Sequence, residues 1–258
     1  MTDAVRGGSN PTVRYPSYID FDRFIDVDRL KSLDQFITGR IERHIRDRQD
    51  SYFLNLHRLD QSSPYRPGVR EIWLSKTAPT TEYNYLDLDK PGLWEFAEAA
   101  VEFAPVMDFI ATLPFAATGR ILIIYDDGGN SVPAHRDHED TEVCNEFIWM
   151  RTNFNKPFYL LNPDTGEKRY VTSHSAWFDS VNQFHGADGA DRLSFSIRVD
   201  GIFSDRLREQ IPYPSHGRAA APAVWAAAEM KDALGNIYWP ADRPVIESRQ
   251  SVISRKLP

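Results

Sequence analysis

The segment Arg192–Asp200, RLSFSIRVD, alternates polar and apolar residues without interruption. Successive side chains of a β-strand point to opposite faces of a sheet, so this segment predicts a strand with two distinct faces. The polar face would carry Arg192, Ser194, Ser196 and Arg198, and the apolar face Leu193, Phe195, Ile197 and Val199. The apolar face is expected to lie on a hydrophobic core. The polar face has two interpretations, a solvated outer surface or the lining of an interior site.

Short strand-like runs precede this segment from Arg120 onward, and the turn signals DDGGN, NPDTGE and GADGAD separate several of them. The expected strands are RILIIY (120–125), SVPAH (131–135), NEFIWMR (145–151), KPFYLL (156–161), KRYVTS (168–173) and SAWFDSV (175–181). Many short strands at this spacing indicate an all-β sandwich or barrel of the jelly-roll kind. We expect this core to span residues 113–203.

The flanking regions predict helices around the β core. Apolar residues at steps of three and four between Leu30 and Ile45 indicate an amphipathic helix. We expect β structure in FLNLHRL (53–59) and VREIWLS (69–75), and two helices over 92–112 that Pro105 separates. The sequence predicts a single domain over residues 1–258, organised as a flexible leader (1–17), an N-terminal helical and β elaboration (18–112), the core (113–203) and a C-terminal helical tail or lid (204–258), with a helix around 219–234.

The composition narrows the class of partner and the compartment. A formal net charge of -7 disfavours a nucleic-acid or membrane-surface partner, because such proteins usually carry excess positive charge. The single cysteine, Cys144, excludes an internal disulfide, and no apolar stretch is long enough to cross a bilayer. We therefore expect a soluble cytoplasmic protein, whose oligomeric state the sequence does not reveal.

The segment His135-Arg136-Asp137 and the distant His185 form a candidate metal site. In a strand, residues at positions i and i+2 share a face, so His135 and Asp137 can reach one ion together. Two imidazoles and one carboxylate suit iron(II) and leave about three of six coordination positions open. The tripeptide also occurs by chance, and His138 offers a rival but less supported frame. We expect His185 to lie at the end of a different strand, from which a barrel brings it to the other two residues.

In this order, HRD (135–137), His185 and RLSFSIR (192–198) resemble the iron(II)/2-oxoglutarate-dependent dioxygenases. The segment WFDSVNQFHGADGADRLSFSIRVD (177–200) is most similar to the aspartyl/asparaginyl β-hydroxylase branch, although the two arginines six residues apart are also similar to the nucleobase-demethylase branch. The resemblance implies a double-stranded β-helix, a cupin-like barrel. It also implies that His135, Asp137 and His185 are iron ligands.

The resemblance further implies 2-oxoglutarate as cosubstrate and O2 as oxidant. Arg192, helped by Ser194, is then the expected partner of the distal 2-oxoglutarate carboxylate, with Arg198 as the alternative because Arg192 follows His185 by only seven positions. Tyr125 is placed to hydrogen-bond the cosubstrate, or is a buried structural tyrosine. The implied reaction hydroxylates an unactivated C–H bond and releases succinate and CO2, and the retained Asp137 favours hydroxylation over halogenation.

The sequence leaves the substrate open. Trp149, Arg151 and Asn153 share one face of an expected strand, and Arg151 either binds an acidic group or belongs to a solvated row. A small polar molecule, such as an amino acid, a peptide side chain or a natural-product intermediate, fits an acidic enzyme. The alternatives are a cupin-type metalloenzyme that does not use 2-oxoglutarate and a non-catalytic jelly-roll binding protein.

Overall fold

The structure, a computed structural model, covers the central part of the chain most completely. It describes residues 17–46, 60–62, 69–78, 80–81, 87–88, 90, 92–137, 143–162, 165–180, 183–211, 230–231, 237–238 and 247–248. The expected leader (1–17) therefore lies almost wholly outside the described residues, as does the expected strand over 53–59.

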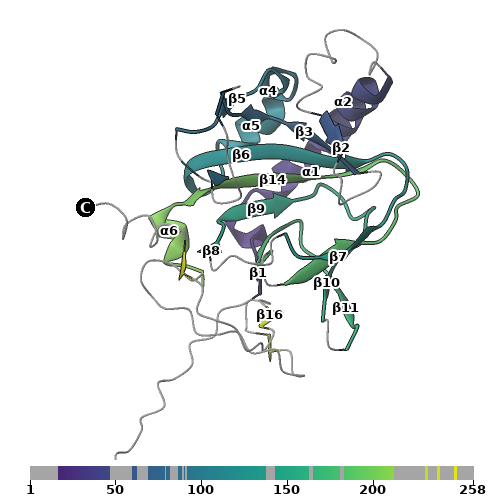
Figure 1. The fold of residues 1–258 in the computed structure, drawn as a ribbon, viewed down its shortest axis with the longest axis vertical. Coiled ribbons are helices and arrows are strands. Elements are labelled where there is room, and N and C mark those ends of the chain that lie inside the picture. Colours follow the sequence, from purple (N-terminus) through teal and green to yellow (C-terminus); the bar gives the residue numbers. More distant parts are fainter. Residues whose placement is uncertain are drawn as a thin grey trace, which may run out of the picture.

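The strands form two main sheets (Figure 1). The larger sheet has nine strands, in the spatial order β15 (Met230–Lys231), β16 (Ile237–Tyr238), β1 (Tyr18–Asp20), β12 (Ser175–Phe178), β9 (Phe147–Met150), β14 (Ser194–Phe203), β6 (Phe115–Asp126), β3 (Val69–Trp73) and β2 (Asp60–Ser62). The smaller sheet has four strands, in the order β11 (Lys168–Tyr170), β10 (Phe158–Leu161), β13 (Phe184–Ala187) and β7 (Val132–His135). Two further pairs join β17 (Glu247–Ser248) to β8 (Val143–Cys144), and β4 (Ser75–Lys76) to β5 (Glu95–Phe96).

The strand order identifies the core as a double-stranded β-helix. From β6 to β14 the chain passes repeatedly between the two sheets, which places β12-β9-β14-β6 in one sheet and β11-β10-β13-β7 in the other. All the pairs within these two four-strand sets are antiparallel. This is the jelly-roll arrangement, so the predicted fold class is confirmed.

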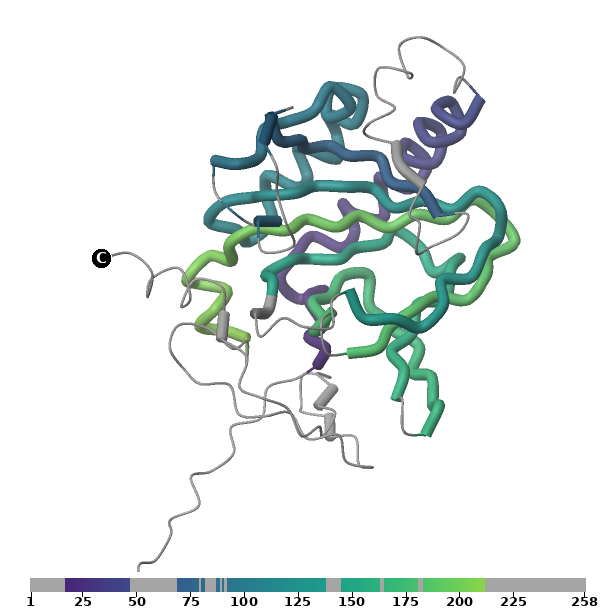
Figure 2. Tube along the Cα trace, viewed as in Figure 1, coloured from purple at the N-terminus to yellow at the C-terminus, as the bar shows by residue number. Residues whose placement is uncertain are grey.

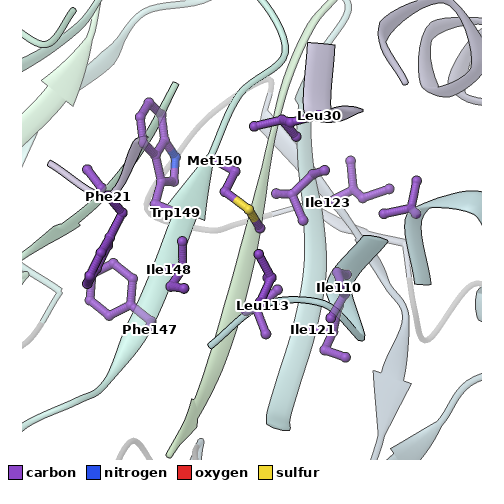
Figure 3. Close-up of a cluster of buried hydrophobic side chains, with 14 of the residues drawn as sticks. Phe21, Leu30, Ile110, Leu113, Ile121, Ile123, Phe147, Ile148, Trp149 and Met150 are labelled. Atoms are coloured by element: carbon purple, nitrogen blue, oxygen red, sulfur yellow. The ribbon is translucent and has the colours of Figure 1, made fainter. Parts of the chain in front are cut away.

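The large sheet packs one face on helices. Ile197 of β14 pairs with Ile123 of β6 and with Met150 of β9, and all three are fully buried. Figure 3 shows Leu30, Met150 and Ile123 together in this apolar layer. Since neighbouring residues of a strand face opposite ways, Ser196 and Arg198 are turned to the interior of the barrel.

Most of the helices are short, and all of those in the described residues except α6 precede β6 in the sequence. Their bounds are η1 (Asp22–Phe24), α1 (Val27–Ser32), α2 (Asp34–Arg46), α4 (Ala99–Glu102), α5 (Ala104–Ile110) and α6 (Asp205–Arg208). The purple N-terminal segment passes behind the teal and green strands of the large sheet (Figure 2). The amphipathic helix expected from Leu30 to Ile45 is divided into two, because α1 ends at Ser32 and α2 begins at Asp34.

Three further expectations can be compared with the described residues. Pro105 lies in the first turn of α5 and separates it from α4, as predicted, but residues 95–96 form β5 instead of helix. His185 does not end the strand before it; it lies on a separate strand, β13. The helix expected over 219–234 falls mostly outside the described residues, but Met230–Lys231 form a strand, because they pair with β16.

Asp22 joins the N-terminal segment to the barrel. Its carboxylate accepts hydrogen bonds from the backbone N–H groups of His174 (3.0 Å) and Ser175 (2.7 Å) and from the Ser175 hydroxyl (2.8 Å). The neighbouring Phe21 is fully buried, and its N–H donates to the Ser175 carbonyl. The start of β12 is therefore held by one carboxylate.

We expect Asp22→Ala to lower the free energy of unfolding by about 1–3 kcal/mol, because it leaves three partly buried donors of His174 and Ser175 without their acceptor. Urea denaturation followed by fluorescence measures this loss. The matched control is Asp28→Ala on α1, which removes a 94% exposed carboxylate and should change stability little. Equal losses in the two variants would contradict the anchoring role of Asp22.

Candidate metal centre

Three metal-ligating side chains meet where β7 pairs with β13. His135 is the last residue of β7, Asp137 follows two residues later, and His185 lies directly opposite His135 in the strand register. Their ligand atoms all lie within 4.8 Å of one another. The structure thus brings together the three residues that the sequence selected as a metal site.

Backbone carbonyls fix the orientation of both imidazoles. Nδ1 of His135 lies 2.8 Å from the Pro133 carbonyl oxygen, and Nδ1 of His185 lies 3.0 Å from that of Gln183. A carbonyl oxygen only accepts, so in both rings Nδ1 carries the hydrogen. In the neutral rings Nε2 then carries the lone pair, which is the atom a metal needs.

The Asp137 carboxylate faces both Nε2 atoms. Its Oδ1 lies 3.6 Å from Nε2 of His135 and 3.4 Å from Nε2 of His185. The backbone N–H of Asp137 donates to the Ser180 carbonyl at 2.7 Å, which fixes the chain just after β7. Two imidazole nitrogens and one carboxylate oxygen therefore converge on one point.

This donor set fits a divalent transition metal. Imidazole and carboxylate ligands with open positions are the arrangement of non-haem iron(II) sites. The His185 and Asp137 side chains are 6% and 8% exposed, and that of His135 is 27% exposed, although its Nε2 atom is buried. Residues His135, Asp137 and His185 would hold the ion.

Arg198 contacts this cluster from the large sheet. Its Nη1 donates to Oδ2 of Asp137 at 2.8 Å, and its Nε donates to Asp200 at 3.0 Å. The resemblance left Arg198 as the alternative to Arg192 for binding a carboxylate of 2-oxoglutarate. In the structure its guanidinium contacts two carboxylates of the protein itself.

The cluster borders a cavity inside the barrel that is partly open to solvent. The cationic part of its lining is Arg151, Lys156 and Arg198, and the aromatic part is Tyr125, Trp149, Phe158, Phe178 and Phe195. The Phe178 ring lies 4.8 Å from the His185 ring, between centroids. The metal cluster therefore borders a partly apolar chamber that holds three cations and two carboxylates, Asp126 and Asp137.

Of the remaining residues predicted from the sequence, some line this cavity and one does not. Ser194 and Ser196 line the cavity together with Arg198. From Ser194 on, the polar face of this strand therefore lines an interior site and is not a solvated surface. Arg192 is exposed, precedes β14 and does not line the cavity, so the structure does not bring it to the metal cluster. Tyr125 borders the cavity and is buried, but its ring packs at 6.3 Å from His44 of α2. The helix-covered side of the sheet therefore holds the Tyr125 ring.

Lys156 and Asp126 form a partly buried pair that the sequence did not predict. The Lys156 ammonium contacts Oδ2 of Asp126 and donates to the Asn130 carbonyl at 2.5 Å. Burial favours a higher pKa for Asp126, but hydrogen bonds from Lys156, Asn130 and the Gly128 N–H outweigh it, and the pKa falls below its usual value. The Asp126 carboxylate therefore stays charged at neutral pH. Nothing in the local sequence predicts it, because the two residues are thirty positions apart.

Arg151 is a buried cation that donates its hydrogen bonds to backbone carbonyls and also interacts electrostatically with the Asp22 carboxylate. It is 3% exposed, and its guanidinium donates to the carbonyls of Ser173 (3.1 Å), Val171 and Lys156 (3.5 Å). Burial lowers the pKa of Arg151 to about 10, so the group remains charged at neutral pH. Lys156 has a carboxylate partner, whereas the contacts of Arg151 within the described residues are to carbonyls and aromatic rings.

Comparisons with known proteins gave no sequence relative. No protein-family model matches the chain, and no curated protein matches it. In the described part of the chain, no helix combines the length and the apolar character needed to cross a membrane.

Solved structures of similar shape were found at low sequence identity. A prolyl hydroxylase from Trichoplax adhaerens, solved with a hypoxia-inducible-factor peptide fragment, has a TM-score of 0.40 and 13% identity over 76% of this chain and 87% of that chain. A prolyl-4-hydroxylase from Pseudomonas putida has a TM-score of 0.40 and 13% identity over 72% and 91% of the two chains. A 2OG-Fe(II) oxygenase family protein from Burkholderia pseudomallei has a TM-score of 0.34 and 8% identity over 60% and 80%. At these scores the likeness alone establishes neither fold nor activity, so the fold assignment rests on the strand order.

Gly186, next to His185, allows the three strands of the site to approach closely. A Cβ atom here would lie 2.6 Å from both the Tyr159 hydroxyl and the Val132 carbonyl, and the carbonyl belongs to the strand that carries His135. We expect Gly186→Ala to cost about 1–3 kcal/mol of stability through overpacking. We also expect weaker binding of Mn²⁺ as a metal probe, because β7 is displaced.

The matched control is Gly39→Ala in α2, where nothing lies within 4 Å of an added Cβ. Alanine at a helix interior should raise stability by about 0.5–1 kcal/mol and leave Mn²⁺ binding unchanged. Thermal denaturation and Mn²⁺ titration measure both effects. Wild-type Mn²⁺ affinity in Gly186→Ala would show that the spacing of β7 and β13 does not set the site.

Proposed function

We propose that this chain is an iron(II)- and 2-oxoglutarate-dependent oxygenase that hydroxylates a C–H bond of a small polar or peptide substrate. One observation carries the proposal. Two histidine Nε2 atoms and one aspartate oxygen converge at the edge of a chamber inside a double-stranded β-helix. Such a facial set holds a metal on one side and leaves the other side open for cosubstrate and oxygen.

Each part of the site has a role in this proposal. His135, Asp137 and His185 hold iron(II) and act as the catalytic residues. Bound iron(II), 2-oxoglutarate and O2 together supply the oxidising power, and succinate and CO2 are released as one oxygen atom enters the substrate C–H bond. The aromatic lining, Phe178 and Phe158 beside His185, excludes water from the reacting groups.

The distal carboxylate of 2-oxoglutarate needs a cation within the chamber, and Arg151 is the best candidate. A buried guanidinium bound by neutral carbonyls gains more from an anion than Lys156, which already pairs with Asp126. Ser194 and Ser196 line the same cavity and supply hydroxyl groups for the same carboxylate. This assignment replaces Arg192, which is exposed, and Arg198, which contacts Asp137 and Asp200.

For the branch, the sequence pattern favours the aspartyl/asparaginyl β-hydroxylases, and for the substrate, the net charge favours a small molecule or a peptide. The Trp-x-Asp pattern of the aspartyl/asparaginyl β-hydroxylase branch corresponds to Trp177 and Asp179. The Trp177 indole donates to the Asn145 carbonyl at 3.0 Å, and neither residue lines the cavity. These residues therefore stabilise the barrel and do not select a substrate. The net charge of -7 continues to favour a small molecule or a peptide over nucleic acid.

The first experiment is an oxygenase assay. Purified protein with Fe²⁺, ascorbate, O2 and 2-oxoglutarate should form succinate, and a panel of amino acids and peptides should raise the rate. His135→Ala should reduce succinate to background, because two ligands hold the metal poorly. His44→Gln, a buried histidine outside the cavity, is the control and should retain activity.

Different outcomes separate the alternatives. Metal-dependent turnover of a chelating substrate without 2-oxoglutarate would indicate a cupin-type metalloenzyme. Absence of metal binding in the wild-type protein would indicate a non-catalytic jelly-roll binding protein. Either result would contradict the proposed oxygenase.

The second experiment tests the carboxylate partner with a paired cosubstrate. Wild-type enzyme should prefer 2-oxoglutarate to 2-oxopentanoate, which has the same chain length but no distal carboxylate. Arg151→Met should abolish this preference and raise the half-saturating 2-oxoglutarate concentration by at least about 30-fold, equivalent to about 2 kcal/mol for a lost buried charge contact. A larger effect of Arg192→Ala would return the role to Arg192. Circular dichroism of each variant controls for misfolding.

A further inference from the structure

The guanidinium of Arg198 lies between two carboxylates, one in the metal cluster and one in the barrel wall. Its Nη1 is 2.8 Å from Oδ2 of Asp137. Its Nε and Nη2 are each 3.0 Å from Oδ1 of Asp200. A single planar group thus fixes the position of a metal ligand relative to strand β14.

Asp200 is itself held from the far side. It is fully buried, and its Oδ2 accepts a hydrogen bond from Nε of Arg120 on β6 at 2.9 Å. Two arginines and two aspartates therefore form a row of ion pairs from the metal cluster to the edge of the barrel, and their formal charges cancel. Because the charges are paired, their mutual attraction offsets the desolvation penalty of burying these four side chains.

Packing restricts the plane of the Arg198 guanidinium. Its central carbon lies 4.0 Å from the centre of the Phe147 ring, and Phe147 is buried on β9. Stacking on an aromatic face and a fixed fork of N–H donors are properties that lysine lacks. The orientation of Arg198 is therefore set by β9 and β14 together.

The two oxygens of Asp137 consequently have different roles. Oδ1 faces the Nε2 atoms of His135 and His185, whereas Oδ2 faces Arg198. A carboxylate free to turn can use both oxygens on one metal and occupy a further coordination position. A carboxylate held at Oδ2 offers the metal one oxygen.

We propose that Arg198 is a positioning residue that makes Asp137 a single-oxygen metal ligand and thereby keeps coordination positions open for cosubstrate and oxygen. Asp200 and Arg120 maintain Arg198 in this role. The inference rests on the proposed metal site and assigns to Arg198 a function in metal binding, distinct from recognition of 2-oxoglutarate. Outer contacts of this kind orient ligands and tune metal affinity.

The structure supplies a matched control for a buried arginine. Arg208 of α6 forms a two-point pair with Glu146, at 2.9 Å and 2.6 Å, and its side chain is 6% exposed. Arg198 has a similar exposure, 7%. Neither Arg208 nor Glu146 lines the cavity. Loss of either arginine should reduce stability, but only loss of Arg198 should change the metal site.

The experiment measures Mn²⁺ affinity by electron paramagnetic resonance titration of the full-length protein, and thermal stability in parallel. Arg198→Met should weaken Mn²⁺ binding about 10- to 100-fold. Arg198→Lys should weaken it less, because the charge remains but the two-carboxylate bridge is lost. Asp200→Asn should also weaken it, whereas Arg208→Met should lower thermal stability and keep wild-type Mn²⁺ affinity. Visible absorption of the Co²⁺-loaded protein should show a higher coordination number in Arg198→Met.

The outcomes are distinguishable from those of the proposed function. If the wild-type protein binds Mn²⁺ and Arg198→Met binds it equally well, the positioning role is overturned while the metal site stands. If Arg208→Met loses Mn²⁺ affinity as strongly as Arg198→Met, the effect is one of general stability and the inference also fails. If the wild-type protein binds no Mn²⁺, both the metal site and the inference are overturned. Arg198→Lys keeps the test decisive if Arg198→Met does not fold.

Discussion

Burial of β14 on both faces is the constraint on which the other features depend. The strand lies between β6 and β9, so its backbone hydrogen bonds are satisfied on both edges. Ile197 faces the helix-covered layer, while Ser196 and Arg198 face the chamber. A shift of one residue would exchange these faces, placing an arginine in the apolar layer and an isoleucine beside the metal cluster. The apolar core and the functional site therefore hold the same register in place.

Closure of the barrel brings the candidate metal ligands and Arg198 together. The smaller sheet contributes His135 and His185 from neighbouring strands, and the larger sheet contributes Arg198, which contacts Asp137. Backbone carbonyls orient both imidazoles, so the ligand set is organised by the chain itself. The chamber then combines this cluster with aromatic walls and with Arg151, whose hydrogen bonds to described residues go to carbonyl oxygens. These features together support metal-dependent oxidation over simple ligand binding.

Much of the barrel was predictable because local alternation and turn residues carry strong signals. The strands β6, β7, β9, β10, β11, β12 and β14 overlap the expected runs. The strand β13 was missed, because four residues with a central glycine, FHGA, carry no alternating pattern. The helix expected over 219–234 was wrong at Met230–Lys231, which pair with β16 as a strand. The alanine-rich composition of this segment favours a helix locally. Local preference is overridden where a neighbouring strand supplies hydrogen bonds.

Residue alternation and side-chain chemistry are local properties, so the fold class and the triad His135, Asp137 and His185 could be predicted from the sequence. The contacts of the cations follow from the folded arrangement. Arg192 and Arg198 share a face in the sequence pattern, but one is exposed before the strand begins and the other bridges two carboxylates. Arg151 and the Lys156–Asp126 pair lie in the chamber because distant strands converge there. Charge interactions depend on distance in space and on burial, and neither quantity is fixed until the two sheets close on one another.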